Sequence, residues 1–430
     1  MGSLGKRATD KNGNGVSWVK KLGPGLITGA ADDDPSGIAT YSQAGAQFGL
    51  NMLWTVLFTF PLMVGIQIVS ARIGRTTGQG LSMNIRQHYP RWLLYSIVGL
   101  LLFANTVNIA ADVAAMGGAL NLIMGGEPKI YAACFGLFSV LLQLFIPYSR
   151  YVRILKWMTL VLLAYVASAL VVQVPWGDVA LRTFWPELSW SSQYISLVVA
   201  VFGTTISPYL FFWQAGQEVE DRHLQAGGFL PQTSSQAHHN FHRIKVDTYI
   251  GMAFSNIVAF FIILSAAVTL HNEGAINIQT SADAARALRP IAGEFAFLLF
   301  SFGIIGTGLL AIPVLAGSSA YAIAEAFNWE NRSLELHPRM AKRFYSIIVI
   351  STLAGVGLGY TSVDPIKALF ISAVINGVIA VPIMAIMMSM AVKPEIMGKF
   401  VIRRNLQLLG RLAVVLMTIA VIAMFWTYAN

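Results

Sequence analysis

Long apolar runs recur from near the N-terminus to the last residues of the chain, with shorter polar stretches between them. Each run approaches the ~20 residues that a helix needs to cross ~30 Å of hydrocarbon. The runs are continuous rather than alternating, which favours helices over the strands of a membrane barrel. The pattern therefore predicts an all-α membrane protein of about eleven transmembrane helices. The predicted spans are 24–48, 52–71, 93–123, 130–148, 154–174, 194–216, 247–270, 292–325, 344–361, 365–391 and 410–428.

Composition supports a membrane environment. Of the 430 residues, 56% are hydrophobic and 11% are charged, against about 25% charged in a typical soluble domain. So few charges cannot cover a water-facing surface, which makes lipid the main solvent of this chain. A single cysteine, Cys134, excludes an intrachain disulfide and a cysteine-based metal cluster.

The basic residues are sorted along the predicted topology. With the N-terminus placed in the cytosol and the spans alternating, 24 of the 29 Lys and Arg residues fall on the inside. The five on the outside are Lys129, Arg182, Arg286, Arg289 and Lys367. Such an excess of positive charge on cytosolic segments predicts a cytosolic N-terminus and an external C-terminus. It also accounts for the net charge of +9 without a nucleic-acid partner.

The chain divides into three parts by composition. Residues 1–22 are polar, lack the apolar core of a cleavable signal, and are expected to form a retained cytosolic tail. Residues 23–391 form the predicted membrane core. Residues 392–430 add a basic loop and one further helix.

The first span contains the acidic triplet Asp32, Asp33 and Asp34, followed at once by Pro35. One ionised Asp at the centre of a span costs ~2.5–3.5 kcal/mol, so the triplet must meet water, a cation or a shared proton. Pro35 removes a backbone donor, and Gly37 loosens the backbone further. A broken helix frees carbonyl oxygens that can bind a cation together with carboxylates, which makes Asp33, Asp34 and the Gly37 position candidate metal-site residues. A triplet in bulk water at a helix end is the alternative, but apolar sequence continues on both sides.

The sixth span contains a second break, at Pro208. Thr204, Thr205 and Ser207 lie directly before this proline and are further candidate ligands. Breaks in spans one and six are typical of two five-helix repeats of inverted topology, with the substrate site at their interface. The predicted repeats are about 23–175 and 192–391.

Several motifs occur in the order found in one transporter family. They are Asp34-Pro35, Gln43-Ala44-Gly45-Ala46, Phe48-Gly49, Arg72-Ile73-Gly74, Thr77-Gly78-Gln79-Gly80-Leu81, Tyr89-Pro90, Ala119-Leu120-Asn121-Leu122 and Glu325-Ala326-Phe327. Over residues 22–391 the chain resembles the Nramp divalent-metal transporters. The resemblance implies a LeuT-type fold, alternating access, and a metal ion held between the breaks of helices one and six. It also implies an integral protein of a bacterial inner membrane with a monomeric functional unit.

Departures from the family motifs bear on the ion. Gly37 stands where the family has Asn, Ser207 where it has Met, and Tyr209 where it has His. Thr204 stands where the family uses an alanine carbonyl. A thioether suits transition metals, whereas hydroxyl, carboxylate and carbonyl oxygens suit Mg²⁺ or Ca²⁺. The chain thus resembles the Nramp-related magnesium transporters, which predicts transport of Mg²⁺, with Mn²⁺ as a second ion, through an oxygen-lined site.

The resemblance also implies a proton path. Asp112 in span three stands where Nramps have Glu, with Asn108 one turn earlier, and Arg343 lies where the family has arginines near span nine. Lys342 and Arg343 could equally be cytosolic anchors. Because this acid–base set is thinned, we expect weak or absent proton coupling.

Two further polar features leave alternatives open. Asn376 in span ten could offer an amide oxygen to the cation or form a helix–helix hydrogen bond. His238, His239 and His242 have the spacing of metal ligands if helical. Neighbouring Ser and Gly residues favour a mobile loop instead.

Three other functions are alternatives to magnesium transport. The main alternative is an ordinary Nramp symporter of Mn²⁺ or Fe²⁺ coupled to protons. A carrier of organic solutes on the same fold is another. An intramembrane aspartyl protease requires two facing carboxylates and a Gly-x-Gly-Asp motif that the chain lacks. We therefore expect no enzyme and no resident cofactor, with the transported cation and the lipid bilayer as partners.

Overall fold

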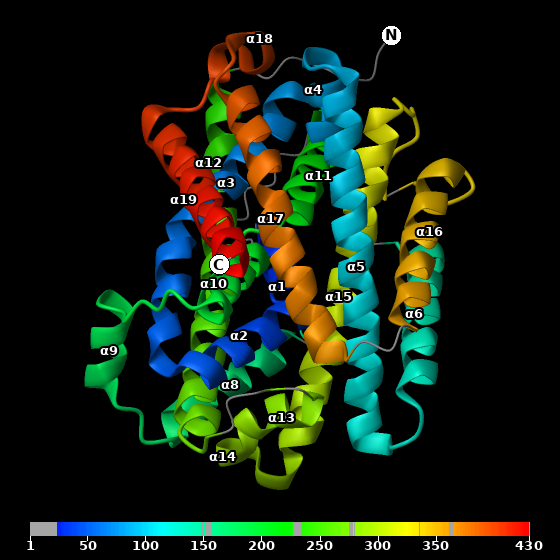
Figure 1. Ribbon diagram of the computed structural model, residues 1–430. Helices are drawn as coiled ribbons and strands as arrows, with labels where there is room; N and C mark the ends of the chain where they lie inside the picture. Colours follow the sequence, from blue (N-terminus) through cyan, green and yellow to red (C-terminus); the bar gives the residue numbers. More distant parts are fainter. Residues whose placement is uncertain are drawn as a thin grey trace, which may run out of the picture.

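The computed structural model describes residues 24–147, 150, 157, 159–226, 234–274, 278, 280–334, 336–360 and 364–429. All regular secondary structure in these residues is helical (Figure 1). The first predicted span is two helices, α1 (Pro24–Asp32) and α2 (Pro35–Phe48). The sixth is also two helices, α10 (Ser192–Thr205) and α11 (Pro208–Ala226). Both predicted breaks are therefore present.

Each remaining predicted span coincides with a helical segment, although the first residues of the fifth lie outside the described part. The segments are α3 (Leu53–Thr77), α5 (Arg91–Met124), α6 (Pro128–Phe145), η3 (Thr159–Leu162) with α8 (Leu163–Val171), α12 (Ser234–Ala266) with η4 (Ala267–His271), α15 (Ala296–Ala326), α16 (Lys342–Gly359), α17 (Pro365–Ala391) and α19 (Arg404–Ala429). Short helices lie in segments expected to be loops. These are α4 (Leu81–His88), α9 (Trp176–Phe184), α13 (Ser281–Ala285), α14 (Arg289–Ala292) and α18 (Pro394–Met397).

Eight helical segments in the described residues are long and apolar enough to cross a membrane. The number is nine if the bent pair Leu160–Val171 and Trp176–Phe184 forms one span. This count treats Pro35–Thr77 as a single segment and does not include α16. The membrane-spanning character of the chain agrees with the prediction, while the number eleven stays a prediction.

The connecting helices are sorted between the two ends of the bundle. In Figure 1, α4 and α18 lie at the upper end, and α9, α13 and α14 lie toward the opposite end. These are the segments predicted to be inside and outside, respectively. The separation follows from the alternating path of the chain. Which end faces the cytosol stays a prediction, and residues 1–22 lie outside the described part.

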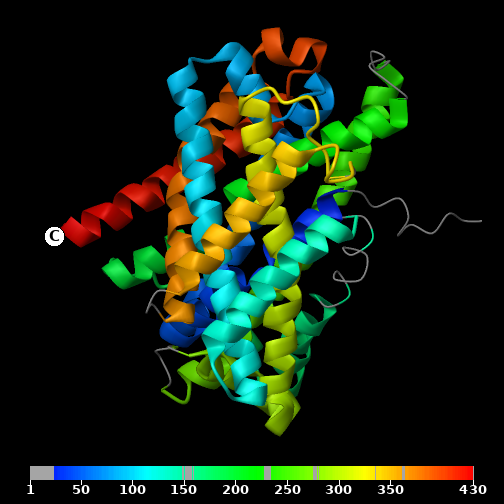
Figure 2. The same ribbon diagram turned by 90° about the vertical axis from the view of Figure 1, so that its right-hand side faces the viewer.

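The two broken helices lie within the bundle, where small residues allow close packing. Gly203 on α10 faces the backbone of Ala373 and Gly377 on α17, so that a Cβ atom at Gly203 would overlap them. Such small-residue contacts are how membrane helices approach closely. By contrast, α19 leans away from the other helices (Figure 2) and exposes most of its apolar side chains.

The histidine segment differs from the prediction. Helix α12 begins at Ser234, so His238, His239 and His242 lie on a helix rather than in a mobile loop. Arg243, further along the same helix, forms ion pairs with Glu218 and Asp221 on α11. All three histidines are exposed.

Candidate metal site

The break in the first span is organised by Asp34. This residue is extended, with φ −70° and ψ 172°, and it precedes α2 as the N-cap. Its Oδ1 accepts a hydrogen bond of 2.7 Å from the backbone N–H of Gly37. Pro35 occupies the first helical position, where its missing N–H is not needed. The sequence Asp-Pro-Ser-Gly therefore ends one helix and starts the next, with a buried carboxylate at the junction.

The break in the sixth span presents hydroxyl groups. The Ser207 Oγ lies 2.9 Å from the carbonyl oxygen of Gly203 and 2.8 Å from that of Thr204, to which it donates. Thr205 donates in the same way to Val201. The hydroxyl protons are thus directed back along α10, which leaves oxygen lone pairs as the groups that a cation can use.

The breaks of the first and sixth spans meet at Gly37, one of the positions where the sequence departs from the Nramp motifs. A Cβ atom on Gly37 would lie 3.2 Å from Thr204 Oγ1 and 3.3 Å from the ring of Tyr41. Tyr209, at the family's histidine position, donates a hydrogen bond of 2.9 Å to the carbonyl oxygen of Ala31 in α1. Thr204 therefore occupies the space next to Gly37 that an Asn side chain at this position would need. Tyr209 joins α11 to the end of α1.

Asn108 on α5 connects Asp34 to two other predicted residues. Its Nδ2 donates to Asp34 Oδ2 at 2.9 Å and to Asp112 Oδ2 at 3.3 Å. Its Oδ1 accepts from Asn376 Nδ2 on α17 at 3.2 Å. All four side chains are buried. The structure therefore brings Asp34, Asp112 and Asn376 together around one amide that the sequence analysis had not assigned to the site.

Asp33 lies on a different side of the break. Ser255 Oγ on α12 is 2.6 Å from Asp32 Oδ2 and 3.0 Å from Asp33 Oδ1. Both carboxylates are completely buried. The predicted ligands Asp33 and Asp34 are thus directed to different neighbouring helices, α12 and α5.

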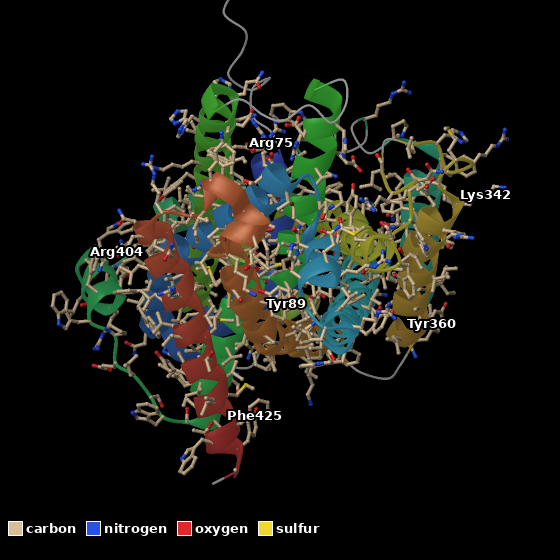
Figure 3. All side chains as sticks on the ribbon, turned by 90° about the horizontal axis from the view of Figure 1, so that it is seen from above. Arg75, Tyr89, Lys342, Tyr360, Arg404 and Phe425 are labelled. Carbon is tan, nitrogen blue, oxygen red and sulfur yellow. The ribbon has the colours of Figure 1, made fainter. Side chains whose placement is uncertain are left out.

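Arg343 is remote from Asp112. It lies exposed in the first turn of α16, whereas Asp112 is buried within α5. Seen from above in Figure 3, its neighbour Lys342 lies at the edge of the bundle. Between these described side chains no ion pair is formed. The two predicted members of the proton path are not in contact.

Two residues of this region were missed. Asn108 had a signal, because it lies four residues before Asp112 and therefore on the same face of its helix. Ser255 had none, because its role depends on how α12 packs against α1. The structure also joins two of the family motifs, since Glu325 accepts hydrogen bonds from the backbone N–H groups of Ser82 and Met83 at the start of α4.

Within the described part of the chain, no three His, Cys, Asp or Glu side chains converge to hold a metal ion. A cation at Asp34 would therefore need ligands beyond these side chains, such as hydroxyl, amide or carbonyl oxygens and water. These are hard ligands.

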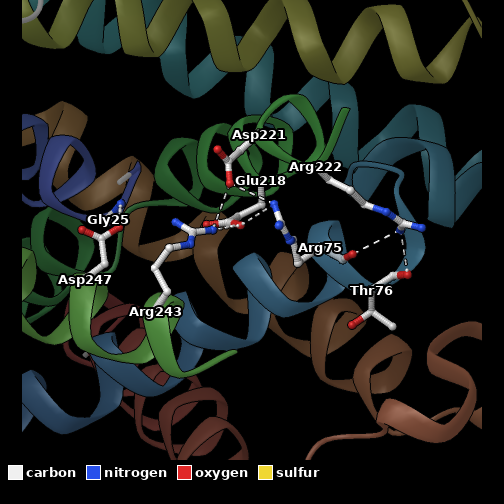
Figure 4. Close-up of polar contacts among 8 residues, drawn as sticks. All are labelled: Gly25, Arg75, Thr76, Glu218, Asp221, Arg222, Arg243 and Asp247. Carbon is white, nitrogen blue, oxygen red and sulfur yellow. Dashed lines mark hydrogen bonds and ion pairs between the residues drawn. The ribbon is translucent and has the colours of Figure 1, made fainter. Parts of the chain in front are cut away.

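A second group of charges, buried or half-buried, lies near the ends of α3, α11 and α12 (Figure 4). Arg75 pairs with Asp221 at 2.9 Å, and Arg243 pairs with Glu218 at 2.6 Å and with Asp221 at 3.2 Å. Arg222 donates to the carbonyl oxygens of Arg75 and Thr76 at the end of α3. The neighbouring start of α1 is tied to α12 by a bond of 2.7 Å from the Gly25 N–H to Asp247.

Comparison with known proteins identifies the family of this chain. A family model described as Nramp, natural resistance-associated macrophage protein-like, matches residues 25–427. The chain belongs to the Nramp family. Among its Nramp relatives, a divalent metal cation transporter MntH from Yersinia pestis (strain Pestoides F) is 27% identical over 429 residues, covering 96% of this chain and 97% of that protein. The MntH of Acidiphilium cryptum (strain JF-5) is 25% identical over 417 residues, covering 93% and 89%.

Solved structures confirm the expected LeuT-type fold. The Eremococcus coleocola manganese transporter superposes with a TM-score of 0.71 at 17% identity, covering 97% of this chain and 90% of that one. Mhp1, a nucleobase-cation-symport-1 family transporter, superposes with a TM-score of 0.54 at 14% identity, covering 95% and 92%. The MntH proteins and the Eremococcus coleocola protein are named as transporters, in agreement with the expectation that the chain is not an enzyme. The magnesium branch within the family stays a prediction.

Proposed function

We propose that this Nramp protein carries divalent metal cations across the membrane by alternating access, with Asp34 as the charged ligand. One observation carries the proposal. The Asp34 carboxylate is buried at a helix break, accepts hydrogen bonds from the Asn108 side chain and the Gly37 backbone, and forms no ion pair with a described residue. A buried charge without a partner is costly, and a transported cation supplies the missing positive charge.

Mn²⁺ and Mg²⁺ are favoured by different observations. The names of the relatives, which refer to divalent metal cations and to manganese, favour Mn²⁺ and thus the ordinary Nramp function. The carboxylate, hydroxyl and amide groups at the two breaks, with Ser207 and Gly37 in place of Met and Asn, favour a hard ion that keeps several waters. We therefore propose a transporter that accepts Mn²⁺ as its relatives do and also admits Mg²⁺.

Proton coupling in this proposal is weak or absent. The acid Asp112 is buried beside Asn108, and Arg343 is at the bundle surface. Because Arg343 does not contact Asp112, the predicted proton path lacks the basic residue that would follow Asp112. The chain is proposed to act as a monomer in a bacterial inner membrane, with a cytosolic N-terminus and an external C-terminus.

The test is a metal panel in proteoliposomes with a pH dye in the lumen. We expect uptake of Mn²⁺ and Mg²⁺ without acidification of the lumen. A variant without the charged ligand, Asp34→Ala, provides the inactive control. Absence of uptake of any divalent ion would refute the proposed function. Uptake of Mn²⁺ with Mg²⁺ excluded would refute the magnesium proposal, and acidification during uptake would restore the proton-coupled alternative.

A further inference from the structure

The amide of Asn108 uses all of its hydrogen-bonding groups at one point between three helices. Its two N–H groups face Asp34 Oδ2 and Asp112 Oδ2, and its carbonyl oxygen faces the Asn376 amide nitrogen. The opposite orientation would point the Asn108 oxygen at two carboxylate oxygens, all of them acceptors. The two acids therefore determine the orientation of Asn108.

The orientation of Asn108 in turn determines that of Asn376. Because Asn108 offers an oxygen, Asn376 must present its N–H group, which leaves the Asn376 Oδ1 on the other side. This Oδ1 is buried and has no hydrogen-bond partner among the described residues. It is thus the atom of Asn376 that a cation can use.

Asn108 also restricts the coordination of Asp34. The Oδ1 of Asp34 accepts the Gly37 N–H and its Oδ2 accepts the Asn108 N–H, so each oxygen already has one donor. A cation that takes both oxygens must share them with both donors, whereas a cation that takes one oxygen and keeps its waters meets only one of the two donors. Ca²⁺ takes six to eight oxygens and uses bidentate carboxylates, whereas Mg²⁺ demands a compact octahedral set and keeps several waters.

We infer that Asn108 is a positioning residue that selects against Ca²⁺, because it holds Asp34 to one-oxygen coordination and turns Asn376 Oδ1 toward the cation. This inference rests on the proposed divalent-metal transport and names a determinant of its selectivity. Asn108 acts through Asp34 and Asn376 rather than as a ligand itself.

The chain provides a matched control one turn away. Asn105 is equally buried on α5, but its amide donates to Leu315, Ser318 and Ser319 on α15, away from the acids. A general need for a buried amide on α5 would make the two residues equivalent. A role in ion selection would separate them.

The experiment compares Asn108→Ala with Asn105→Ala in the full-length protein. Binding of Mg²⁺, Mn²⁺ and Ca²⁺ is measured by calorimetry, and uptake is measured in proteoliposomes. Loss of a residue that orients a metal ligand typically costs about 10–100-fold in affinity, and we expect this loss for Mg²⁺ and Mn²⁺ in Asn108→Ala. Because Asp34 becomes free to use both oxygens, Ca²⁺ should lose less, so that the Ca²⁺-to-Mg²⁺ affinity ratio rises by about tenfold. In Asn105→Ala the ratio should stay at the wild-type value.

Two further variants keep the test decisive. Asn108→Leu has a similar size but lacks both donors and the acceptor, and it should also lose Mg²⁺ affinity if Asn108→Ala does not fold. Combining Asn108→Ala with Asn376→Ala should add little to the loss of Mg²⁺ affinity, because the first change already frees Asn376.

The outcomes separate this inference from the proposed function. A wild-type protein that takes up divalent ions, together with an Asn108 variant of unchanged Ca²⁺-to-Mg²⁺ ratio, would overturn the role of Asn108 alone. An equal change of the ratio in Asn105→Ala would also overturn it. A wild-type protein that neither binds nor carries a divalent ion would overturn the proposed function, and the inference with it.

Discussion

Two groups of buried or half-buried charges lie in the same helical bundle, and they differ in whether positive and negative charges balance. Near the ends of α3, α11 and α12, Arg75 and Arg243 face Glu218 and Asp221, so that each charge has an opposite one within 4 Å. At the break of the first span, Asp32, Asp33 and Asp34 lie with Asp112 in the interior, and none forms an ion pair with a described residue.

The difference indicates two uses of charge. A balanced cluster holds helices together, since removing one member leaves an uncompensated charge. An unbalanced group of buried acids is costly to the bundle, and such a group inside a membrane protein usually marks a functional site, here the cation site that we propose. The two regions should therefore respond to mutation in opposite ways, one in stability and the other in transport.

The largest effect on stability is expected in the balanced cluster. Glu218→Ala would leave Arg75 and Arg243 with Asp221 alone, at a cost of about 3–5 kcal/mol in the free energy of unfolding. Denaturant unfolding of the detergent-solubilised protein measures this. Glu273→Ala, which changes an exposed acid, is the control and should have no measurable effect. Equal stability of the Glu218 and Glu273 variants would contradict a structural role for the cluster.

Neutralising the unbalanced group should affect transport without a comparable loss of stability. In Asp34→Asn the side chain can still cap α2, because Asn is as good an N-cap as Asp. We expect the free energy of unfolding to stay within about 1 kcal/mol of wild type, since the change also removes a costly buried charge. Metal uptake should fall by ~10–100-fold or more. Loss of a residue that only supports a metal ligand already costs this much, and Asp34 is itself the proposed ligand. A strongly destabilised variant that still carries metal would show that Asp34 serves stability rather than transport.

A smaller effect on stability is expected at Ser255, whose hydroxyl group lies between Asp32 and Asp33. Ser255→Ala removes the donor shared by Asp32 and Asp33, which should cost about 1–3 kcal/mol in unfolding free energy. The control is Ser346→Ala, because Ser346 is exposed and bonds only to its own helix in the described contacts. If Ser255→Ala is as stable as wild type, the two carboxylates do not depend on this hydroxyl.

The smallest effect concerns which ion the unbalanced group prefers. Ser207→Met returns a thioether to the helix-six break, and it should raise the preference for Mn²⁺ over Mg²⁺ by about tenfold, the equivalent of ~1.4 kcal/mol. Competition between the two ions for uptake measures the ratio. Gln193→Met places the same side chain on the exposed first turn of α10 and should leave the ratio unchanged. An unaltered ratio in Ser207→Met would show that residue 207 does not face the ion.

Much of the fold was accessible to sequence analysis, because lipid imposes strict rules on a chain. Every predicted span coincides with a helix, and both proline breaks lie where the apolar pattern and Pro35 and Pro208 indicated. The short helices were missed because segments of four to nine residues are too brief for a clear hydrophobic period. The segment of His238 was wrongly predicted as a loop because neighbouring Ser and Gly residues favour loops.

The sequence by itself determined that the chain spans a membrane, where its first and sixth helices break, and that carboxylates lie at the first break. These features depend on local properties, namely apolar length, proline chemistry and the cost of charge in lipid. Only the tertiary structure decided that Asp34 turns to Asn108 while Asp33 turns to Ser255. Consecutive residues at a helix break can point in any direction, and the packing of α5 and α12 against the break selects one for each.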